Sequence, residues 1–304
     1  MLELYLISSP YVFLGVNGKR ERNPLSFVGV PFDSTNSFRS GSRFAPIRIR
    51  LASHSLETYS FRNGLALEEN PPVDEGDVAV VHGSAEATLK NISVVAEELF
   101  NTRKAVFVGG DHIITYGIVK GLFNALRKSP CVLVFDAHLD FRPDYLGFKY
   151  SHACTTRRVS EVVGTKNIMV LGFRAVDARE LKEAREAGLN IVNSYELHKM
   201  TLREVVSKVR EFLSTCDYTY VSLDMDVIDP AYAPGVSTPE PEGLQPTLVI
   251  DLLTNIIDEK TSGLDLVEVN PLVDSGDITS FLAAKILIEV FTRLLSIIRA
   301  RDSR

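Results

Sequence analysis

The sequence predicts an α/β fold in which a mainly parallel sheet lies between two layers of helices. Short apolar runs alternate with longer helical patterns along nearly the whole chain of 304 residues. These runs are continuously apolar, which indicates strands buried on both faces, as in a parallel sheet. No Pro-, Gly- or Ser-rich linker and no internal repeat divides the sequence. We therefore expect a single three-layer αβα domain over residues 1–304.

Seven runs of the sequence have strand character. They are short, rich in apolar and β-branched residues, and bounded by polar or turn-forming residues. In chain order they cover residues 25–30, 77–82, 104–109, 131–136, 167–173, 218–224 and 264–269. The segments between them show helical periodicity, so we expect helices near 46–60, 85–101, 113–127, 177–187, 201–214 and 246–259.

The two ends of the chain depart from this alternation. Residues 1–24 precede the first expected strand, and we expect them to form an N-terminal extension or an oligomer contact. The apolar run 281–301 carries Lys285, Glu289 and Arg293 at every fourth position. This single polar stripe predicts an amphipathic helix that packs on the core and does not span a membrane.

The composition is that of a globular protein, with 45% hydrophobic residues, 24% charged residues and a net charge of −6. The negative charge argues against nucleic-acid and membrane partners and favours small cationic ligands. Three cysteines are too few for a disulfide framework, which favours a reducing cytosol. The N-terminus also lacks the basic segment of a secretory signal. We expect a soluble, cytoplasmic protein.

The motif FDAHLD, at 135–140, carries the strongest chemical signal. It follows the apolar run CVLVF, and in an extended strand Asp136, His138 and Asp140 point to the same side. Two carboxylates and an imidazole on one face are costly as packing and well suited to a divalent metal ion. A second run, YVSLDMD, adds Asp224 and Asp226. The repetition indicates one shared site.

Acidic or imidazole side chains follow four of the expected strands at their carboxyl ends. They are His112, Asp136, His138, Asp140, Asp224, Asp226 and Glu268. Ligands of doubly wound sheets bind outside these strand ends, so we expect the side chains to meet in one crevice. The charge of four aspartates matches two divalent cations, and oxygen-rich ligation with one imidazole per ion favours Mn²⁺. Two such ions can activate a shared water, which predicts a hydrolase.

Single residues of these types have simpler explanations. We expect Asp111 and Asp229 to form turns or helix caps. We expect His54, His82 and His198 to be surface or internally satisfied histidines. Such explanations do not extend to the six ligand candidates together, because burying four carboxylates without a metal is unfavourable.

At these residues the sequence resembles the ureohydrolases, the family of arginases and agmatinases, over nearly its whole length. Four motifs occur in the family's order and spacing: GGDH (109–112), FDAHLD (135–140), SLDMDVIDPAYAPG (222–235) and EVNP (268–271). The resemblance implies an eight-stranded parallel sheet flanked by helices, two Mn²⁺ ions per subunit, and a homo-oligomer, either a trimer or a hexamer.

The resemblance also implies a set of ligands for each ion. One ion would be held by His112, Asp136, Asp140 and Asp224, and the other by Asp136, His138, Asp224 and Asp226. Asp136 and Asp224 would then bridge the two ions.

The implied reaction is hydrolysis of a guanidino compound by a hydroxide that bridges the two ions. The guanidinium is cationic at any biological pH, and we expect Glu268 to bind it as a catalytic carboxylate. Asp140 would relay a proton to the leaving nitrogen. His152 matches the family's mobile-loop histidine and would exchange protons with solvent. The simpler explanations are a salt bridge for Glu268 and no role for His152.

The four motifs say less about the part of the substrate that lies away from the guanidinium group. The stretch FRPDYLGFKYSHACTTRR (141–158) resembles the agmatinase pattern, in which YSH is followed by RR, and lacks the arginase loop that holds an α-carboxylate. The segment GVPFDSTNSFRSGSRFAPIRIR (29–50) also resembles agmatinases. The resemblance thus implies agmatine as substrate, with putrescine and urea as products, and a place in polyamine supply.

Several alternatives remain open from the sequence. Asp177 or Glu180 would bind a terminal ammonium, although each is equally explained as a helix-start acid. Arg142 or Lys149 would instead meet a carboxylate, which would favour guanidinobutyrate; an arginase is a further alternative. A catalytically silent homologue and a one-zinc deacetylase of the same fold are the other classes.

Overall fold

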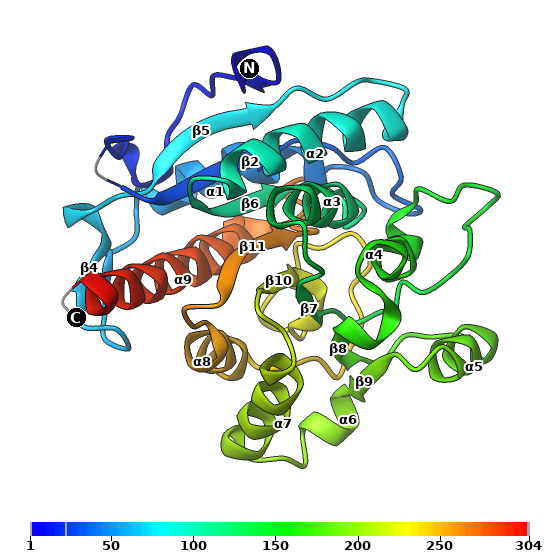
Figure 1. The fold of residues 1–304 in the computed structure, drawn as a ribbon. Helices are drawn as coiled ribbons and strands as arrows, with labels where there is room; N and C mark the ends of the chain where they lie inside the picture. Colours follow the sequence, from blue (N-terminus) through cyan, green and yellow to red (C-terminus); the bar gives the residue numbers. More distant parts are fainter. Residues whose placement is uncertain (1, 22, 303–304) are drawn as a thin grey trace.

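A nine-stranded sheet runs through the computed structural model, which describes residues 2–21 and 23–302 (Figure 1). The strands lie in the order β1-β5-β2-β6-β11-β10-β7-β8-β9. Their bounds are β1 (Leu6–Ile7), β2 (Leu25–Val30), β5 (Val73–Val78), β6 (Lys104–Gly109), β7 (Cys131–Phe135), β8 (Ile168–Phe173), β9 (Asn190–Asn193), β10 (Thr219–Asp224) and β11 (Thr261–Val267). β1 pairs antiparallel with β5, and the other eight strands are parallel. The expected eight parallel strands are confirmed, with a short antiparallel edge strand added.

Helices cover both faces of this sheet and make three layers (Figure 1). They are α1 (Ala45–Ser53), α2 (Ala85–Phe100), α3 (Ile114–Leu126), α4 (Thr155–Val163), α5 (Ala178–Glu186), α6 (Ser194–Leu197), α7 (Leu202–Ser214), α8 (Pro246–Ile256) and α9 (Ile278–Asp302). Strand β7 shows why both faces are apolar. Leu133 and Phe135 join the core beneath α1, α7, α8 and α9, whereas Val132 and Val134 join the core beneath α2, α3 and α4. This period of two buries a strand between two helix layers.

Some element boundaries differ from the sequence-based expectation. β5 begins at Val73, not at 77, because its polar residues find partners: buried Asp74 pairs with buried Arg50 of α1 at 2.8 Å. α1 ends at Ser53, where the chain turns into the hairpin of β3 (Tyr59–Ser60) and β4 (Leu65–Ala66). The elements not predicted from the sequence are β1, β3, β4, α4, α6 and β9, and all but α4 have only two to four residues.

The C-terminal helix α9 packs on α1 and α8, as expected for a docked helix. Much of its polar stripe faces the protein. Buried Glu289 accepts hydrogen bonds from Ser60 Oγ at 2.6 Å and pairs with Lys285 Nζ at 2.7 Å. Arg293 Nε donates to the carbonyl of Ile257 at 3.1 Å. Among the residues described, no helix has the length and apolarity needed to cross a membrane.

The N-terminal segment and two cysteines add long-range ties. β1 extends the sheet, and the buried Phe13 donates its N–H to Asp74 at 2.8 Å.

Cys131 and Cys216, 85 positions apart, form a disulfide with a Cα–Cα distance of 5.8 Å. Three cysteines were too few to predict a disulfide framework, yet this one bond forms because the start of β7 lies beside the end of α7. Cys154 is a buried free thiol.

Candidate metal centre

The candidate site lies at the carboxyl ends of β6, β11, β10 and β7, which are neighbours in the sheet. Gly110 allows three segments to meet there. Its N–H donates to the carbonyl of Val30 at 3.1 Å, and its own carbonyl accepts from the N–H of Glu268 at 2.9 Å. A Cβ at this position would lie 1.7 Å from the carbonyl oxygen of Phe32. This close approach places His112 beside Glu268, whose Oε1 accepts the His112 backbone N–H at 2.9 Å.

Two overlapping groups of potential ligands form the centre. The first group is His112, Asp136 and Asp224, and the second is Asp136, His138 and Asp226. His112 Nδ1 lies 3.0 Å from Asp136 Oδ2, 3.1 Å from Asp140 Oδ2 and 3.3 Å from Asp224 Oδ2. His138 Nδ1 lies 2.9 Å from Asp226 Oδ2 and 3.5 Å from Asp136 Oδ1. The fold thus brings the six ligand candidates together, and Asp136 belongs to both groups.

The donor atoms of this centre lack the partners that buried polar atoms need. Asp136, Asp224, Asp226 and Asp140 are only 0%, 2%, 3% and 6% exposed. Within the described residues, His112 Nδ1 and Asp136 Oδ2 are buried and have no hydrogen-bond partner of suitable geometry. Buried polar atoms in native proteins are normally satisfied. A divalent cation would satisfy both atoms, so the residues present fit a metal.

The electrostatics of the centre lead to the same conclusion. Burial lowers the pKa of His112, but the close carboxylates of Asp136 and Asp140 outweigh it and hold that pKa well above its usual value. Burial raises the pKa of Asp224 well above its usual range, and the charges of Asp226 and Asp136 add to the effect. Burial and the Asp136 charge raise the pKa of Asp140 to about 7. The centre therefore holds protons that cations would displace.

A buried hydrogen-bond chain sets the orientation of His112. Its Nε2 lies 3.1 Å from Ser222 Oγ, and that hydroxyl donates to Asp265 Oδ1 at 2.6 Å. Tyr220 donates to the other oxygen of Asp265 at 2.8 Å. Because Ser222 gives its proton to Asp265, it accepts from Nε2–H of His112, which leaves Nδ1 free to bind a metal. Ser222 and Asp265 were not predicted from the sequence, although each is a polar residue inside an apolar strand.

Two carboxylates of the site stand on unusual backbone. Asp140 has φ 50° and Glu268 has φ 65°, in the left-handed region that side-chain-bearing residues rarely adopt. Burial raises the pKa of Glu268 well above its usual value, and the charge of Asp111 adds to this. Such strained residues persist where the surrounding structure fixes them, and they cluster at functional sites.

His152 is fixed by a neighbouring loop. Its backbone N–H donates to Thr35 Oγ1 at 2.9 Å, and its Nδ1 lies 2.7 Å from the Thr35 carbonyl. That carbonyl accepts the Nδ1 proton, so the neutral ring has Nε2 free, 3.4 Å from Ser37 Oγ. Asp111 accepts both the hydroxyl of Thr35, at 2.8 Å, and its N–H, at 2.9 Å. Asp111 thus forms the expected turn with Ile113 and also anchors the loop that holds His152.

A cavity of about 240 Å³ opens beside the second ligand group. We call it the acidic cavity, and it is lined by Ser37, His138, Asp140, Arg142, Tyr145, His152, Ala153, Ala175, Val176, Glu180, Thr238 and Glu240. Asp177 is absent from the lining. It is instead the N-cap of α5, accepting from the N–H groups of Arg179 and Glu180 at 2.9 Å. This placement favours the helix-start explanation of Asp177 over substrate binding.

The cations near this cavity already have partners. Arg142 pairs with Asp177 at 3.0 Å and with Glu180 at 3.4 Å. Lys149 is not among the lining residues of the acidic cavity, and its ammonium lies over the ring of Tyr150, 4.7 Å from the centroid. Both cations thus already have partners in the structure.

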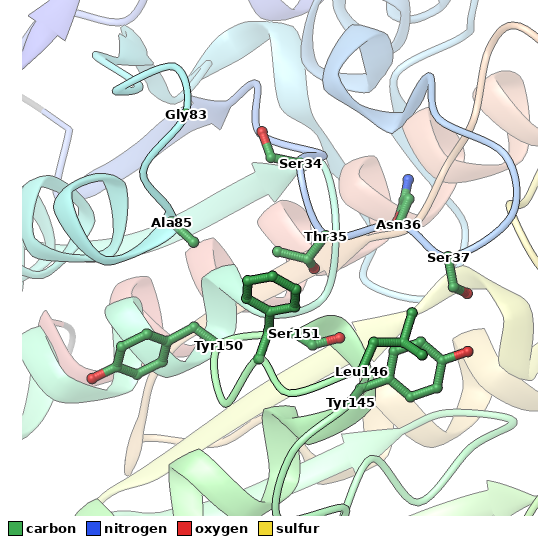
Figure 2. A pocket seen from close by; sticks show the side chains of 11 residues that line it. Ser34, Thr35, Asn36, Ser37, Gly83, Ala85, Tyr145, Leu146, Tyr150 and Ser151 are labelled. Atoms are coloured by element: carbon green, nitrogen blue, oxygen red, sulfur yellow. The ribbon is translucent and has the colours of Figure 1, made fainter.

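A second cavity of about 320 Å³ adjoins the first and shares Ser37 and Tyr145 with it. Figure 2 shows three loops converging on it, with Ser34 to Ser37 on one side, Gly83 and Ala85 on another, and Tyr145 to Ser151 below. We call it the aromatic cavity because Tyr145, Phe148 and Tyr150 line it. No charged side chain of the described residues lines this cavity.

The chain is similar to known proteins over almost its whole length. The sequence model of the arginase family matches residues 23–292. An agmatinase from Bacillus cereus is 34% identical over 284 residues, which are 92% of this chain and 94% of that protein. An N(1)-aminopropylagmatine ureohydrolase from Thermococcus kodakarensis is 35% identical over 271 residues, or 88% and 89% of the two chains. The solved agmatine ureohydrolase of Thermoplasma volcanium has a TM-score of 0.87 and 34% identity, and 97% of each chain is covered.

Proposed function

The chain belongs to the arginase family and is a ureohydrolase, and from this premise we propose that it hydrolyses agmatine to putrescine and urea with two Mn²⁺ ions. The observation that carries the proposal is the pair of buried ligand groups that share Asp136. The resemblance of the substrate-facing loops to agmatinases supports agmatine over arginine.

The metal centre would use the residues that meet at the strand ends. His112, Asp136, Asp140 and Asp224 would hold one ion, and Asp136, His138, Asp224 and Asp226 the other. Carboxylate-rich ligation with one imidazole per ion supports Mn²⁺ over Zn²⁺. When bound, two divalent ions supply a water whose pKa is lowered to near neutrality.

The remaining steps fall to three side chains of the protein. Glu268 would accept N–H donors of the guanidinium, since a buried carboxylate next to a cation gains most from such a pair. Asp140 would lie beside the metal-activated water and would pass a proton to the leaving amine. His152 would exchange protons with solvent through Nε2, because Nδ1 is held by Thr35.

The charges around the acidic cavity support a cationic substrate. Asp140, Glu180 and Glu240 line it, and the one lysine or arginine that lines it, Arg142, is neutralised by Asp177 and Glu180. A substrate carboxylate would find no free positive partner among these residues. This argues for agmatine over guanidinobutyrate and arginine.

A longer guanidino substrate is a second candidate. The aromatic cavity continues from the acidic cavity past Ser37 and Tyr145, and aromatic rings with hydroxyl groups suit an alkylammonium chain. The Thermococcus kodakarensis relative is named for such a substrate, an aminopropyl derivative of agmatine.

Urea release from Mn²⁺-loaded protein tests both candidates. The panel contains agmatine, N(1)-aminopropylagmatine, 4-guanidinobutyrate and arginine, and we expect release from the first or second. Glu268→Gln should lower kcat/KM by about a hundredfold or more, because it removes a buried charge pair with the substrate. Glu211→Gln, exposed on α7, is the control and should leave kcat/KM unchanged. Absence of urea from all four compounds would refute the proposed function.

We also infer a cytoplasmic, single-domain protein that assembles into a trimer or hexamer. Leu146 and Phe148, exposed two positions apart in one loop, would be covered in such an interface. Light scattering on the purified chain checks the assembly, and a monomer would contradict it.

A further inference from the structure

Three carboxylates line the acidic cavity, and two of them are already engaged. Asp140 lies against the ligand nitrogen of His112 at 3.1 Å. Glu180 accepts the backbone N–H of Phe141 at 2.8 Å and pairs with Arg142 at 3.4 Å. The third, Glu240, has no hydrogen bond or ion pair to its carboxylate from any described residue. It is a half-buried carboxylate in the wall of the cavity that no described side chain bonds directly, although the charge of Arg174 lies near it.

The backbone around Glu240 is held in place by one arginine. Arg174 Nη2 donates to the carbonyl of Glu240 at 2.8 Å, and its Nε donates to the carbonyl of Pro241 at 2.8 Å. The same guanidinium donates to the carbonyls of Asp226, at 2.7 Å, and Val227, at 3.2 Å. Arg174 therefore joins the loop of Glu240 to the segment that carries a metal-ligand candidate. Glu240 has a fixed position relative to the metal centre.

We propose that Glu240 is the residue that binds the distal ammonium of the substrate and so determines the preference for a cationic tail. This inference rests on the proposed function and assigns the tail-binding role to Glu240 in place of Asp177. The guanidinium lies at the metal groups and Glu268, so the tail extends along the cavity wall. An ammonium loses water on entering a cavity, and a carboxylate without a partner compensates that loss.

The test compares three substrates that differ at the tail: agmatine, butylguanidine, which ends in a methyl group, and 4-guanidinobutyrate. Glu240→Gln should raise KM for agmatine about tenfold, the value of a hydrogen bond to a charged group, and leave kcat nearly unchanged. Its KM for butylguanidine should not change, because that substrate has no ammonium. Glu240→Lys should improve kcat/KM for 4-guanidinobutyrate over the parent protein.

The matched control is Glu242→Gln, which removes the same charge from an exposed position in the same loop. It should leave KM for agmatine unchanged, and thermal melts should show that both variants fold. An unchanged KM for agmatine in Glu240→Gln, or an equal rise for butylguanidine, would overturn the inference. Parent protein that releases no urea from agmatine would instead refute the proposed function, so the two failures are distinguishable.

Discussion

At the scale of single residues, two histidines of the candidate site are held in position by hydrogen bonds to neighbouring residues. Ser222 fixes the ring of His112, Glu268 holds the backbone of the same histidine, and Thr35 fixes His152. Such partners decide which ring nitrogen carries the proton, and therefore which nitrogen faces the reaction. The proposed catalytic residues are thus oriented by hydrogen bonds from residues outside the ligand set.

The Thr35 hydroxyl should matter only through His152. Thr35→Val removes the hydroxyl that accepts the His152 N–H and donates to Asp111, but keeps the backbone contacts. We expect kcat to fall about tenfold, because the imidazole loses its fixed position, with little change in KM. In a His152→Ala background the same substitution should have no further effect on kcat. Equal losses of kcat in both backgrounds would show that Thr35 acts independently of His152.

The sequence allows the six ligand candidates to be predicted, but not their supporting partners. Asp136, His138 and Asp140 can be predicted because they follow an apolar strand whose carboxyl end faces the ligand edge of the sheet. The expectation that they extend the strand is wrong, because β7 ends at Phe135 and Asp140 has φ 50° in the loop that follows. Thr35 lies 117 positions from His152, and Ser222 lies 110 positions from His112. Contacts of this kind depend on how loops from separate strands meet, which no local pattern encodes.

At the scale of elements, the helices and strands that can be predicted are those whose apolar residues form a long, regular pattern. The apolar strands β6, β7, β8 and β10 lie within a residue or so of their expected bounds. β5 begins four residues before the expected strand, because Asp74 and Asp77 pair with Arg50. This tertiary contact allows acidic residues in a strand and overrides the local pattern. β9 was not predicted because its four residues are too few to show the alternation of a strand. The strand bounds could therefore not be predicted where acidic residues are buried by ion pairs, or where an element is very short.

Helix α5 gives a prediction at this scale, through its N-cap Asp177. Asp177→Ala should lower the free energy of unfolding by about 1 kcal/mol, because two helix N–H groups lose their acceptor. KM for agmatine should change by less than about twofold, since Asp177 does not line the acidic cavity. Chemical denaturation and steady-state kinetics measure the two quantities. A large rise in KM without loss of stability would restore Asp177 as a substrate-binding residue.

At the scale of the whole molecule, the metal centre couples stability to pH. Asp140 has a folded-state pKa of about 7, above its unfolded value, and the pKa of His112 and His138 is also raised. The folded, metal-free protein therefore binds more protons than the unfolded chain between about pH 5 and 8. The stability from these groups is present at the acidic end of that window and is lost as the pH rises.

Metal removal should make this dependence visible. Metal-free protein should melt at a lower temperature at pH 8 than at pH 6, and Mn²⁺ should raise the melting temperature more at pH 8, because cations replace the lost protons. Calorimetric scans with and without Mn²⁺ at both pH values measure the effect. A Mn²⁺ stabilisation that is equal at both pH values, or larger at pH 6, would contradict this coupling.

The measurement that tests the central claim most directly is the count of metal ions bound to each chain. Elemental analysis of protein loaded with Mn²⁺ and freed of excess metal should give about two Mn²⁺ per chain, as a two-metal hydrolytic site requires. Asp136→Asn should lose both ions, because Asp136 belongs to both ligand groups, whereas Asp217→Asn, on the surface, should keep two. One zinc ion per chain, or two ions retained in Asp136→Asn, would contradict the account.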